Sequence, residues 1–597
     1  MIRRVSTIKL ARLSLLSCKN GARPVFKPTR AAFSSNSLRQ TPNSGAVDAD
    51  DKKINNKNSP DFDDFEASFH TKSIIQLFRA NFVYTIATSP FIVSHSDTLL
   101  SYSYKILGAR FTNIFMKQTF FGHFCAGEDE NTIQPTVKYL KRNGIGSILD
   151  YAAEVDPNEA QEQSSTTNSS GIVINKPEQS AAANSSNAES NTLENLTLLP
   201  PDTDFDADDK NKARIYPYHD EELCDAHMDT FDKCIRAVRL VSPTGFAAIK
   251  LTALGNPTLI KRMSVSLQEI KNLFKQFDKK GTGIVSKEDF IEMYQNTFNA
   301  DSKASEEAFN MIDLDLDERI DYIEWSNNLL LENIHSVVKS CKNTKGPLAS
   351  SALDNEEIIL MRNMHARVQH LASIAKELGV RLMIDAEHTH FQPAIDNITL
   401  QLQKEYNKEN AVIFNTYQMY LKNSSKRLSI DVDRSVKSNY FFAAKLVRGA
   451  YMMSEREQAI KNKMPDPIHD TLSATHDNYN AAVKRLVQEM GQGKNIELMI
   501  ASHNQESVEV AIQEMANANL EPDSGVYFGQ LLGMADHLTF SLGRKNYRAY
   551  KYVPYGHVHE VMPYLIRRLQ ENVDVLSNAR HELVMIRREI MRRINIF

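Results

Sequence analysis

The chain has 597 residues, of which 42% are hydrophobic and 24% charged, with a formal net charge of -4. This length exceeds one ordinary domain, so we expect a catalytic domain with insertions. The balanced charge gives no basis for a nucleic-acid-binding function. The five cysteines form no CxxC pair and have no regular spacing, which argues against a disulfide framework and favours a reducing compartment.

The N-terminal segment is basic. Residues 1–47 contain no Asp or Glu, whereas Lys and Arg recur among many Ser and Ala. This composition is typical of an organelle transit peptide, and we predict that residues 1–40 direct the chain to the mitochondrial matrix, with cleavage near Arg30. A disordered basic tail is the alternative. No run of about 18 apolar residues occurs, so a membrane span is not expected.

Two stretches have the composition of disordered segments. Residues 41–65 are polar and acidic, and residues 157–212 consist mainly of Ser, Asn, Glu, Asp and Ala. We interpret the second stretch as an insertion in a surface loop, where added length costs little free energy. Between the two stretches, residues 66–118 are expected to form an N-terminal helical region.

Short apolar runs recur through the rest of the chain with helical segments between them. Eight such runs predict an α/β fold, a (β/α)8 barrel of the TIM type. Residues 119–156 would form its first part, residues 213–258 its continuation, and residues 341–597 the remainder with the C-terminal helices. The runs are Phe120–Ala126, Gly146–Ala153, Phe246–Ala253, Arg381–Glu387, Val412–Tyr417, Phe441–Val447, Glu497–His503 and Val526–Leu532.

Charged and polar residues fall on one face of these runs. Because strand side chains alternate, Leu382 and Ile384 lie opposite Asp385. In barrels of this kind the active site lies at the C-terminal ends of the strands. The alternative is a set of charged residues just past the strand ends, in water. The residues assigned to the inward face are Asp150, Glu154, Lys250, Asp385, Glu387, Asn415, Tyr417, Lys445 and His503.

Residues 259–340 are predicted to be an inserted, all-α EF-hand pair. The second loop, Asp313–Glu324, has carboxylates at positions 1, 3, 5, 9 and 12, the oxygen cage that Ca²⁺ requires. Ile320 at position 8 suits the short strand that pairs two such loops. Glu318 stands at position 6, where glycine normally makes the turn, and this departure is expected to lower the affinity. The predicted ligands are Asp313, Asp315, Asp317, the Arg319 backbone carbonyl, Asp321 and Glu324.

The first loop, Asp278–Asp289, departs further from the calcium-binding pattern. It keeps Gly283 at position 6, but Lys280 stands at position 3 and the short Asp289 at position 12. We therefore expect this loop to be a structural partner of the second one.

Six motifs follow one another in the chain. They are Ile148–Glu154, Ile249–Leu254, Ile384–Glu387, Lys445–Tyr451, Ala501–Asn504 and Tyr564–Asn572. Each alone would be weak, because an Arg pair on a helix is usually solvated and a strand lysine usually extends to water. Taken together, in order and spacing, they are highly specific. From residue 119 onward, outside residues 157–212 and the EF-hand pair, the chain resembles the proline dehydrogenase family.

The resemblance implies oxidation of L-proline to 1-pyrroline-5-carboxylate, the first step of proline catabolism to glutamate. The substrate carboxylate needs a cationic clamp, and the adjacent Arg567 and Arg568 supply planar bidentate donors, with Lys250 as a third cation. Glu571 would hold one guanidinium in its working rotamer. Glu154 would steady the arginines by ion pairing.

Three further residues are implied to surround the substrate. Tyr552 and Tyr564 would wall the proline ring, and Asp385 would lie beside it. A hydroxyproline dehydrogenase of the same family is the nearest alternative, and Tyr552 favours unsubstituted proline. A non-catalytic mitochondrial calcium-binding scaffold is the other alternative, against which the intact cationic residues argue.

The resemblance also implies FAD as cofactor and ubiquinone as electron acceptor. No GxGxxG motif follows a predicted strand, which agrees with a flavin bound across the barrel mouth rather than on a Rossmann fold. Asn415 and Lys445 stand where bacterial members carry Gln and Arg, and both match the mitochondrial branch better. The residues implied to contact FAD are Asn415, Lys445, Arg448, Gly449, Tyr451, His503 and Asn504.

The C-terminal residues carry a separate signal. Residues 585–597 are basic and amphipathic, which suits an anionic membrane surface. This pattern predicts peripheral association with the mitochondrial inner membrane. An ordinary capping helix is the alternative.

Overall fold

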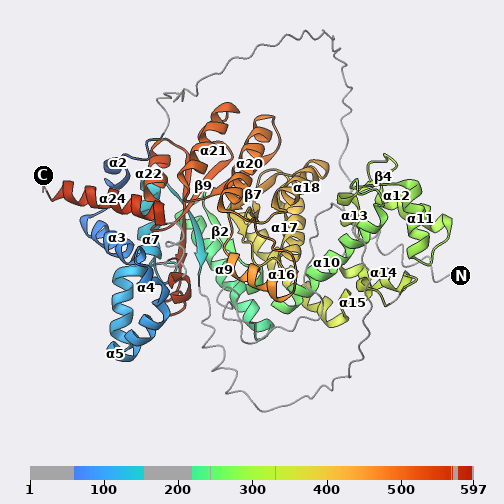
Figure 1. Cartoon of the computed structure of the whole chain (residues 1–597), viewed down its shortest axis with the longest axis horizontal. Coiled ribbons are helices and arrows are strands. Elements are labelled where there is room, and N and C mark those ends of the chain that lie inside the picture. The colour runs from blue at the N-terminus through green and yellow to red at the C-terminus, as the bar shows by residue number, and fades with distance from the viewer. Residues whose placement is uncertain are drawn as a thin grey trace, which may run out of the picture. The chain divides into compact units, whose positions relative to one another are not determined.

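The computed structural model describes residues 60–152, 218–242, 244–329, 331–343, 345–566, 568 and 576–594 (Figure 1). The predicted transit peptide, residues 1–40, and the predicted insertion, residues 157–212, lie outside the described residues. Three predicted site residues, Glu154, Arg567 and Glu571, also lie outside them.

Eight parallel strands close into a barrel, in the order β1-β10-β9-β8-β7-β6-β5-β2. Helices connect successive strands and surround the barrel (Figure 1). The predicted TIM-type α/β fold is therefore confirmed. The strands are β1 (Gly146–Tyr151), β2 (Phe246–Ile249), β5 (Arg381–Ile384), β6 (Ile413–Gln418), β7 (Phe442–Val447), β8 (Ile496–Ala501), β9 (Val526–Leu531) and β10 (Arg548–Tyr555).

One of the eight predicted strands is wrong. The run Phe120–Ala126 lies in a π-helical turn, η1 (Lys117–Phe121), followed by the short helix α6 (Gly122–Phe124). Its buried residues include Phe120, Phe121 and Phe124, whose spacing belongs to one face of a helix rather than to a strand. The eighth strand is β10, which no apolar run marked because it contains the buried Lys551 and Pro554.

Aromatic side chains fill the interior of the barrel. The rings of Phe246, Phe414, Tyr527 and Tyr550 contact one another edge to face, with centroids 5.1 to 6.1 Å apart. All four lie in the N-terminal halves of their strands. They form a packed floor, so polar residues at the opposite, C-terminal end of the strands form the mouth above it.

The helices around the barrel follow their strands in chain order. Capping residues define the ends of several of these helices. In α16, Asp354 and Glu357 form a capping box at the start, and Gly379, with φ +66, is the C-cap. The helices are α9 (Glu221–Val241), α10 (Pro257–Phe277), α16 (Asn355–Leu378), α17 (Gln392–Tyr406), α18 (Ser424–Lys437), α19 (Met452–Lys461), α20 (Leu472–Gly491), α21 (Gln505–Asn517) and α22 (Asp536–Arg544).

A helix–loop–helix pair follows β2, and α10 serves both as a barrel helix and as its first helix. The two loops are joined by antiparallel strands, in which Val285 faces Ile320. Its core is continuous with the core between the barrel strands and helices. Its other elements are β3 (Ile284–Ser286), α11 (Lys287–Thr297), α12 (Ser302–Ile312), β4 (Arg319–Asp321) and α13 (Tyr322–Asn328); η4 (Leu331–Asn333), α14 (Ile334–Ser340) and α15 (Pro347–Ser351) lead to α16.

Helices near the two ends of the described chain pack against each other. The long C-terminal helix α24 (Leu576–Arg593) lies along α3. Phe62 is buried, so order begins earlier than the predicted disordered linker of residues 41–65 allows. The N-terminal helices are α2 (Phe65–Phe69), α3 (Ile74–Ala87), α4 (Pro90–Ser94), α5 (Ser96–Met116) and α7 (Gln134–Arg142).

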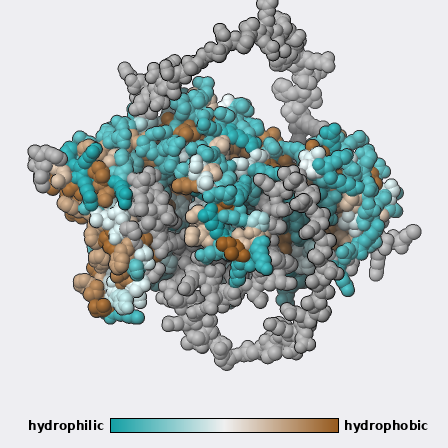
Figure 2. Space-filling view, viewed as in Figure 1, coloured by the Kyte–Doolittle hydropathy of each residue, from teal (hydrophilic) through white to brown (hydrophobic). Residues whose placement is uncertain are grey.

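The N-terminal helices expose apolar side chains, which colour this part of the surface brown in Figure 2. None of the helices in the described part of the chain has both the length and the apolar character needed to cross a bilayer.

Candidate active site at the barrel mouth

Three strands bring a carboxylate, an ammonium group and a phenol together at the mouth. Lys445 on β7 donates from Nζ to Asp385 Oδ1 at 2.5 Å, and Tyr552 on β10 donates from its hydroxyl to Asp385 Oδ2 at 3.0 Å. Burial raises the pKa of Tyr552 well above its ordinary value, and the nearby Asp150 and Asp385 raise it further. The Tyr552 phenol is therefore protonated and donates.

Tyr564 and Arg568, which follow β10 in the chain, face the same mouth. The Arg568 guanidinium lies 4.9 Å from the centre of the Tyr564 ring, a cation–π contact. Tyr564 contributes to the raised pKa of Tyr552, and the Arg568 charge contributes to the lowered pKa of His503. Tyr564 and Arg568 therefore lie within electrostatic reach of Tyr552 and His503.

Lys250 lies directly after β2. Burial raises the pKa of the Glu387 carboxyl, while hydrogen bonds from Thr252 and the Lys250 charge oppose that rise. The Lys250 ammonium therefore lies near the buried Glu387, beside the loop that carries Asp385.

Arg448, just after β7, is bound by neutral groups. It donates to His476 Nδ1 at 2.9 Å, Ser502 Oγ at 2.8 Å and Ser507 Oγ at 2.9 Å, and its guanidinium lies 4.5 Å from the centre of the Tyr479 ring. Burial lowers the pKa of Arg448. Within the described residues no hydrogen bond joins Arg448 to a carboxylate, so its charge is available to an anion.

The N-terminus of α21 adjoins this arginine. Asn504 caps the helix by accepting a hydrogen bond from Ser507 N at 2.8 Å, and Ser507 Oγ also binds Arg448. A helix N-terminus carries partial positive charge and suits phosphate groups. The Arg448 guanidinium and this terminus together form a site for an anion.

The loop after β7 comes very close to its neighbours. Gly449 has φ +147, and a Cβ atom there would lie 2.4 Å from Tyr420 Cδ1, so a side chain cannot fit. Tyr451 is buried, with its ring centre 4.2 Å from that of His388. Glu455 on α19 accepts from Thr389 N at 2.8 Å. These contacts fix the loops after β5 and β7 against each other.

His503 follows β8 and accepts a hydrogen bond at Nε2 from Leu531 N at 3.0 Å. This contact places its proton on Nδ1. Burial, with the Lys551 and Arg568 charges, lowers the pKa of His503 to about 3. The imidazole is therefore neutral at physiological pH.

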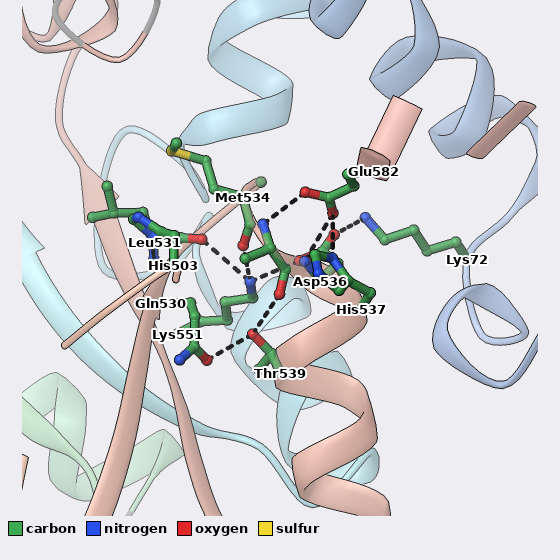
Figure 3. Close-up of polar contacts among 12 residues, drawn as sticks. Lys72, His503, Gln530, Leu531, Met534, Asp536, His537, Thr539, Lys551 and Glu582 are labelled. Atoms are coloured by element: carbon green, nitrogen blue, oxygen red, sulfur yellow. Dashed lines mark hydrogen bonds and ion pairs between the residues drawn. The ribbon is translucent and has the colours of Figure 1, made fainter. Parts of the chain in front are cut away.

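A buried ionic network holds the backbone that binds His503 (Figure 3). Lys551 on β10 donates to Leu531 O at 3.2 Å, Met534 O at 2.5 Å and Asp536 Oδ1 at 2.7 Å. Asp536 also pairs with Lys72, which precedes α3. Burial alone would raise the pKa of the Asp536 carboxyl, but Lys551 and Lys72 hold it well below its ordinary value.

Glu582 extends this network to the C-terminal helix α24. It accepts hydrogen bonds from Ala535 N and Asp536 N, each at 2.8 Å, and from the Tyr84 hydroxyl at 2.6 Å. Both ends of the described chain are thus tied to the loop between β9 and α22. No periodic pattern in the sequence indicates this network, and β10, which carries Lys551, was not predicted as a strand.

The prediction for Asn415 and Tyr417 is corrected by the register of β6. Asn415 Nδ2 donates to Asp396 on α17 at 3.1 Å, and the Tyr417 hydroxyl donates to Asp431 on α18 at 2.9 Å, so both face the helices. Phe414 faces the interior, and alternation places Gln418 inward. Gln418, which the sequence reasoning missed, donates to the backbone oxygen of Glu387 at 2.8 Å.

The acidic loop of the helix–loop–helix pair has its carboxylates close together. Carboxylate oxygens of Asp313, Asp315 and Asp317 lie within 4.8 Å of one another. Glu324 is buried and accepts from Leu314 N and Asp321 N, each at 3.1 Å. Arg319 lies in β4.

Lysines lie against both loops. Lys437 at the end of α18 binds Asp321 at 2.5 Å and Asp315 at 3.4 Å. In the first loop, Lys280 pairs with Asp289 at 3.2 Å, so an ammonium group neutralises a carboxylate where a second cation would otherwise bind.

The proline dehydrogenase family model matches residues 133–581. The chain belongs to the proline dehydrogenase family. It is an oxidoreductase of that family, and the matched residues include all eight barrel strands. The residues that the mouth brings together are Lys250, Asp385, Gln418, Lys445, Arg448, Gly449, Tyr451, His503, Asn504, Tyr552, Tyr564 and Arg568.

Named relatives of this family member cover nearly its whole length. Proline dehydrogenase 1, mitochondrial, of Homo sapiens is 36% identical over 555 residues, covering 89% of this chain and 90% of that protein. Proline dehydrogenase 1, mitochondrial, of Caenorhabditis elegans is 34% identical, covering 89% of this chain and 88% of that protein. Hydroxyproline dehydrogenase of Xenopus laevis is 29% identical, covering 88% and 89%.

Among solved structures, proline utilization A (PutA) from Bdellovibrio bacteriovorus, inactivated by N-propargylglycine, aligns with a TM-score of 0.48 and 15% identity. The alignment covers 86% of this chain and 38% of that longer chain.

Proposed function

We propose that this chain oxidises L-proline to 1-pyrroline-5-carboxylate with FAD as cofactor, the first step of proline catabolism to glutamate. The observation that carries the proposal is the polar cluster of Asp385, Lys445 and Tyr552 at the mouth, with Arg568 and Tyr564 facing it. This arrangement offers cations for a carboxylate and aromatic rings for the apolar part of a small zwitterion.

The groups around Arg448 fit a flavin dinucleotide. The Arg448 guanidinium has neutral partners and adjoins the N-terminus of α21, which suits a pyrophosphate. Gly449 lets the Tyr420 ring pack against the backbone, which holds the loop after β7 in place next to Arg448. The proposed FAD-binding set is completed by Lys445, Tyr451, His503 and Asn504. Asn415 is no longer part of this set, because its side chain points to the helices. When bound, FAD would accept the hydride from the ring carbon beside the proline nitrogen.

The chain's own residues bind and orient the substrate. Arg568, together with Arg567 and Lys250, would hold the carboxylate, and Tyr552 and Tyr564 would pack on the ring. The Tyr552 hydroxyl is fixed by Asp385, so its ring presents one face to the substrate. Glu154 and Glu571 are proposed to steady the arginine pair by ion pairing.

We assign the reaction to the mitochondrial matrix, with electrons passed to ubiquinone at the inner membrane. The relatives that are 34 to 36% identical are named mitochondrial, which supports this location. The basic N-terminal segment agrees with it. A peripheral membrane contact would bring the enzyme to its lipid-soluble acceptor.

Proline is the proposed substrate in preference to hydroxyproline. The hydroxyproline dehydrogenases are 27 to 29% identical to this chain, below the 34 to 36% of the animal proline dehydrogenases. A higher kcat/KM for proline than for hydroxyproline is expected. The reverse order would assign the chain to the hydroxyproline branch.

We further propose that the helix–loop–helix pair is an EF-hand pair whose second loop binds Ca²⁺ through Asp313, Asp315, Asp317, the Arg319 carbonyl, Asp321 and Glu324. The paired strands β3 and β4 and the buried Glu324 at position 12 support this assignment. Lys280 belongs to the first loop itself and pairs with Asp289, which supports a structural role for that loop. Lys437 comes from α18, outside the second loop, and Ca²⁺ would displace it from Asp315 and Asp321.

The visible spectrum of the purified chain tests the catalytic proposal. A flavin band that is bleached on anaerobic addition of proline is the expected result. Arg448→Gln should lose flavin, whereas the exposed Arg544→Ala should keep it. A chain that carries no flavin would leave the calcium-binding scaffold as the better account, whereas a bound flavin that hydroxyproline reduces and proline does not would assign the chain to the hydroxyproline branch.

A further inference from the structure

Large apolar side chains gather on the outer surface of α3, α4 and α5. Their exposed fractions range from 40% to 77%, although soluble monomers rarely expose apolar patches of more than a few hundred Å². In Figure 2 this part of the surface is brown where Figure 1 draws α4 and α5. We call it the N-terminal apolar face; it consists of Ile75, Phe78, Phe82, Phe91, Leu99, Tyr102, Ile106, Leu107, Phe111, Ile114 and Phe115.

Contacts between the helices make this face continuous. The Phe82 ring on α3 meets the Phe115 ring on α5 edge to face, with centroids 6.3 Å apart. Gly108, with φ +76, bends α5. The Tyr104 hydroxyl donates to Asn113 Oδ1 at 2.8 Å across the bend. The two arms of α5 are thus held close, and residues 106–107 lie at the turn.

The charges around the face are nearly all positive. Between residues 74 and 117 the sequence has four Lys or Arg residues and one acidic residue, Asp97. Of the four cations, Lys117 pairs with Glu128 at 2.6 Å and the half-buried Arg79 donates to Gly122 O at 2.7 Å, so Lys105 and Arg110 are the cations that flank the face. Lys105 and Arg110 are exposed on either side of the bend in α5. An apolar surface with such flanking cations has the composition of a helix that lies in an anionic lipid interface.

The C-terminal helix adds further cations along α3. Arg587 on α24 donates to Asn81 Oδ1 at 3.0 Å and to Thr85 Oγ1 at 3.3 Å. Arg588 is exposed beside it on α24, as is Met591, at 41%. The basic C-terminal helix and the N-terminal apolar face therefore belong to one continuous surface.

We propose that this surface docks on an anionic lipid membrane. A second copy of the chain would fit it poorly, because a two-fold interface would bring together two copies of a surface that is itself positively charged. Anionic headgroups complement Lys105, Arg110 and Arg587 while the acyl boundary takes up the apolar side chains. The surface would lie in the interface rather than span the bilayer.

The opposite side of the same helices packs at the barrel mouth. Val83 and Ala87 of α3 share a core with Met534, Tyr564 and Leu565. The docked surface and the proposed substrate site are therefore the two sides of one thin helical layer. Resting on the proposed function, this arrangement would place the mouth close to a lipid-soluble electron acceptor.

Binding of the flavin-loaded chain to phosphatidylcholine vesicles, with and without cardiolipin, tests the proposal. The variant Ile106→Ser/Phe111→Ser/Ile114→Ser should bind cardiolipin vesicles at least roughly tenfold more weakly. Lys105→Glu/Arg110→Glu should bind on the order of fivefold more weakly per removed cation. The matched control Leu240→Ser/Ile359→Ser/Val436→Ser changes exposed apolar residues of α9, α16 and α18 and should bind like the parent.

Other outcomes would overturn the proposal. Equal binding by all variants, or no binding by the parent chain, would show that this surface meets no lipid. A parent dimer that the first variant converts to monomer would identify a second copy as the occupant. Proline-dependent reduction of a water-soluble dye separates the two proposals. Dye reduction without vesicle binding would contradict only the docking surface. Absence of dye reduction would contradict the proposed function.

Discussion

The Arg568 guanidinium is held over the Tyr564 ring at the barrel mouth. A charge-assisted hydrogen bond to the proline carboxylate contributes ~1.5–3 kcal/mol. We expect Arg568→Ala to raise the KM for proline on the order of ten- to a hundredfold and to leave flavin bound. Steady-state kinetics and flavin absorbance measure the two effects. Exposed Arg544→Ala is the control, and a parallel loss of flavin in Arg568→Ala would contradict the assignment.

Asp431 on α18 makes the stability of the chain depend on pH. Burial and the nearby Asp396 raise the pKa of Asp431 to about 6, despite the opposing charges of Arg434 and Arg427. The unfolded state therefore ionises first, and stability falls as pH rises from ~4 to 6, by roughly 2–3 kcal/mol through this group. Asp431→Asn should remove that part of the pH dependence. If the melting temperatures of variant and parent changed in parallel between pH ~4 and 6, Asp431 would not be the source of this pH dependence.

Glu318 adopts φ +62 in the acidic loop, a conformation that favours glycine. Glu318→Gly should relieve this strain and tighten Ca²⁺ binding, by a factor of up to roughly five, which corresponds to ~1 kcal/mol. Calorimetric titration with Ca²⁺ measures the change. The control is Gly283→Glu, which changes the same position of the first loop, where φ is +79. Because that loop is proposed to bind no Ca²⁺, this change should leave the Ca²⁺ affinity nearly unaltered. Equal effects of both changes would argue that both loops bind Ca²⁺.

Residue types were easier to predict from the sequence than side-chain directions. Asp385 and Lys445 were assigned to the inward face of the barrel, and they meet there. Asn415 was assigned to the same face but points to the helices, because it is Phe414 that faces the interior, one residue away from the assigned alternation. A shift of one residue reverses every side chain of a strand, so such an error removes the correct residue, Gln418, as well.

Among the elements, α22 depends on the ionic network at its N-terminus. Asp536→Asn would leave the buried Lys72 and Lys551 with less negative charge, which is expected to lower stability by about 3–5 kcal/mol. Because Lys551 also binds Leu531 O, flavin affinity should fall with it. Thermal melting and flavin titration test both. Asp470→Asn breaks an exposed pair with Lys422 and should change neither the melting temperature nor the flavin affinity. If Asp536→Asn also left both quantities unchanged, the ionic network would not stabilise α22.

Most barrel strands could be predicted because they are short, apolar and flanked by helices. Strand β10 could not, since its buried Lys551 and its Pro554 are residues that normally mark the surface. The burial of Lys551 depends on Asp536 and on two backbone oxygens, contacts that local sequence does not encode. The same strand supplies Tyr552, which the family resemblance proposed as a site residue although the periodicity did not reveal its strand.

For the whole molecule, the sequence predicted the barrel but not how the chain ends complete it. Lys72 and Glu582 meet at the loop between β9 and α22, although 510 positions separate them in the sequence. Long-range ion pairs of this kind leave no local pattern. The helix–loop–helix pair is the opposite case, because its ligand spacing is local and predicts the loops directly.

The helix–loop–helix pair is built into the barrel, and this determines how Ca²⁺ should act on stability. Helix α10 runs from β2 into the first loop, and Trp325 donates to Ile270 O of α10 at 3.2 Å. Ca²⁺ at 100 times its Kd contributes about 2.7 kcal/mol to whichever unit unfolds with the loop. We therefore expect Ca²⁺ to raise the main melting transition by a few °C relative to chelator.

The variant Asp313→Asn/Glu324→Gln, which removes two ligands, should abolish this shift, whereas Asp278→Asn in the first loop should preserve it. Calorimetry decides whether the pair and the barrel unfold together. A small separate transition that alone responds to Ca²⁺ would mean that the shared core around Phe277 and Trp325 does not couple the two parts. A shift of the main transition would mean that Ca²⁺ stabilises the helix that leads out of β2, and with it the mouth where Lys250 lies.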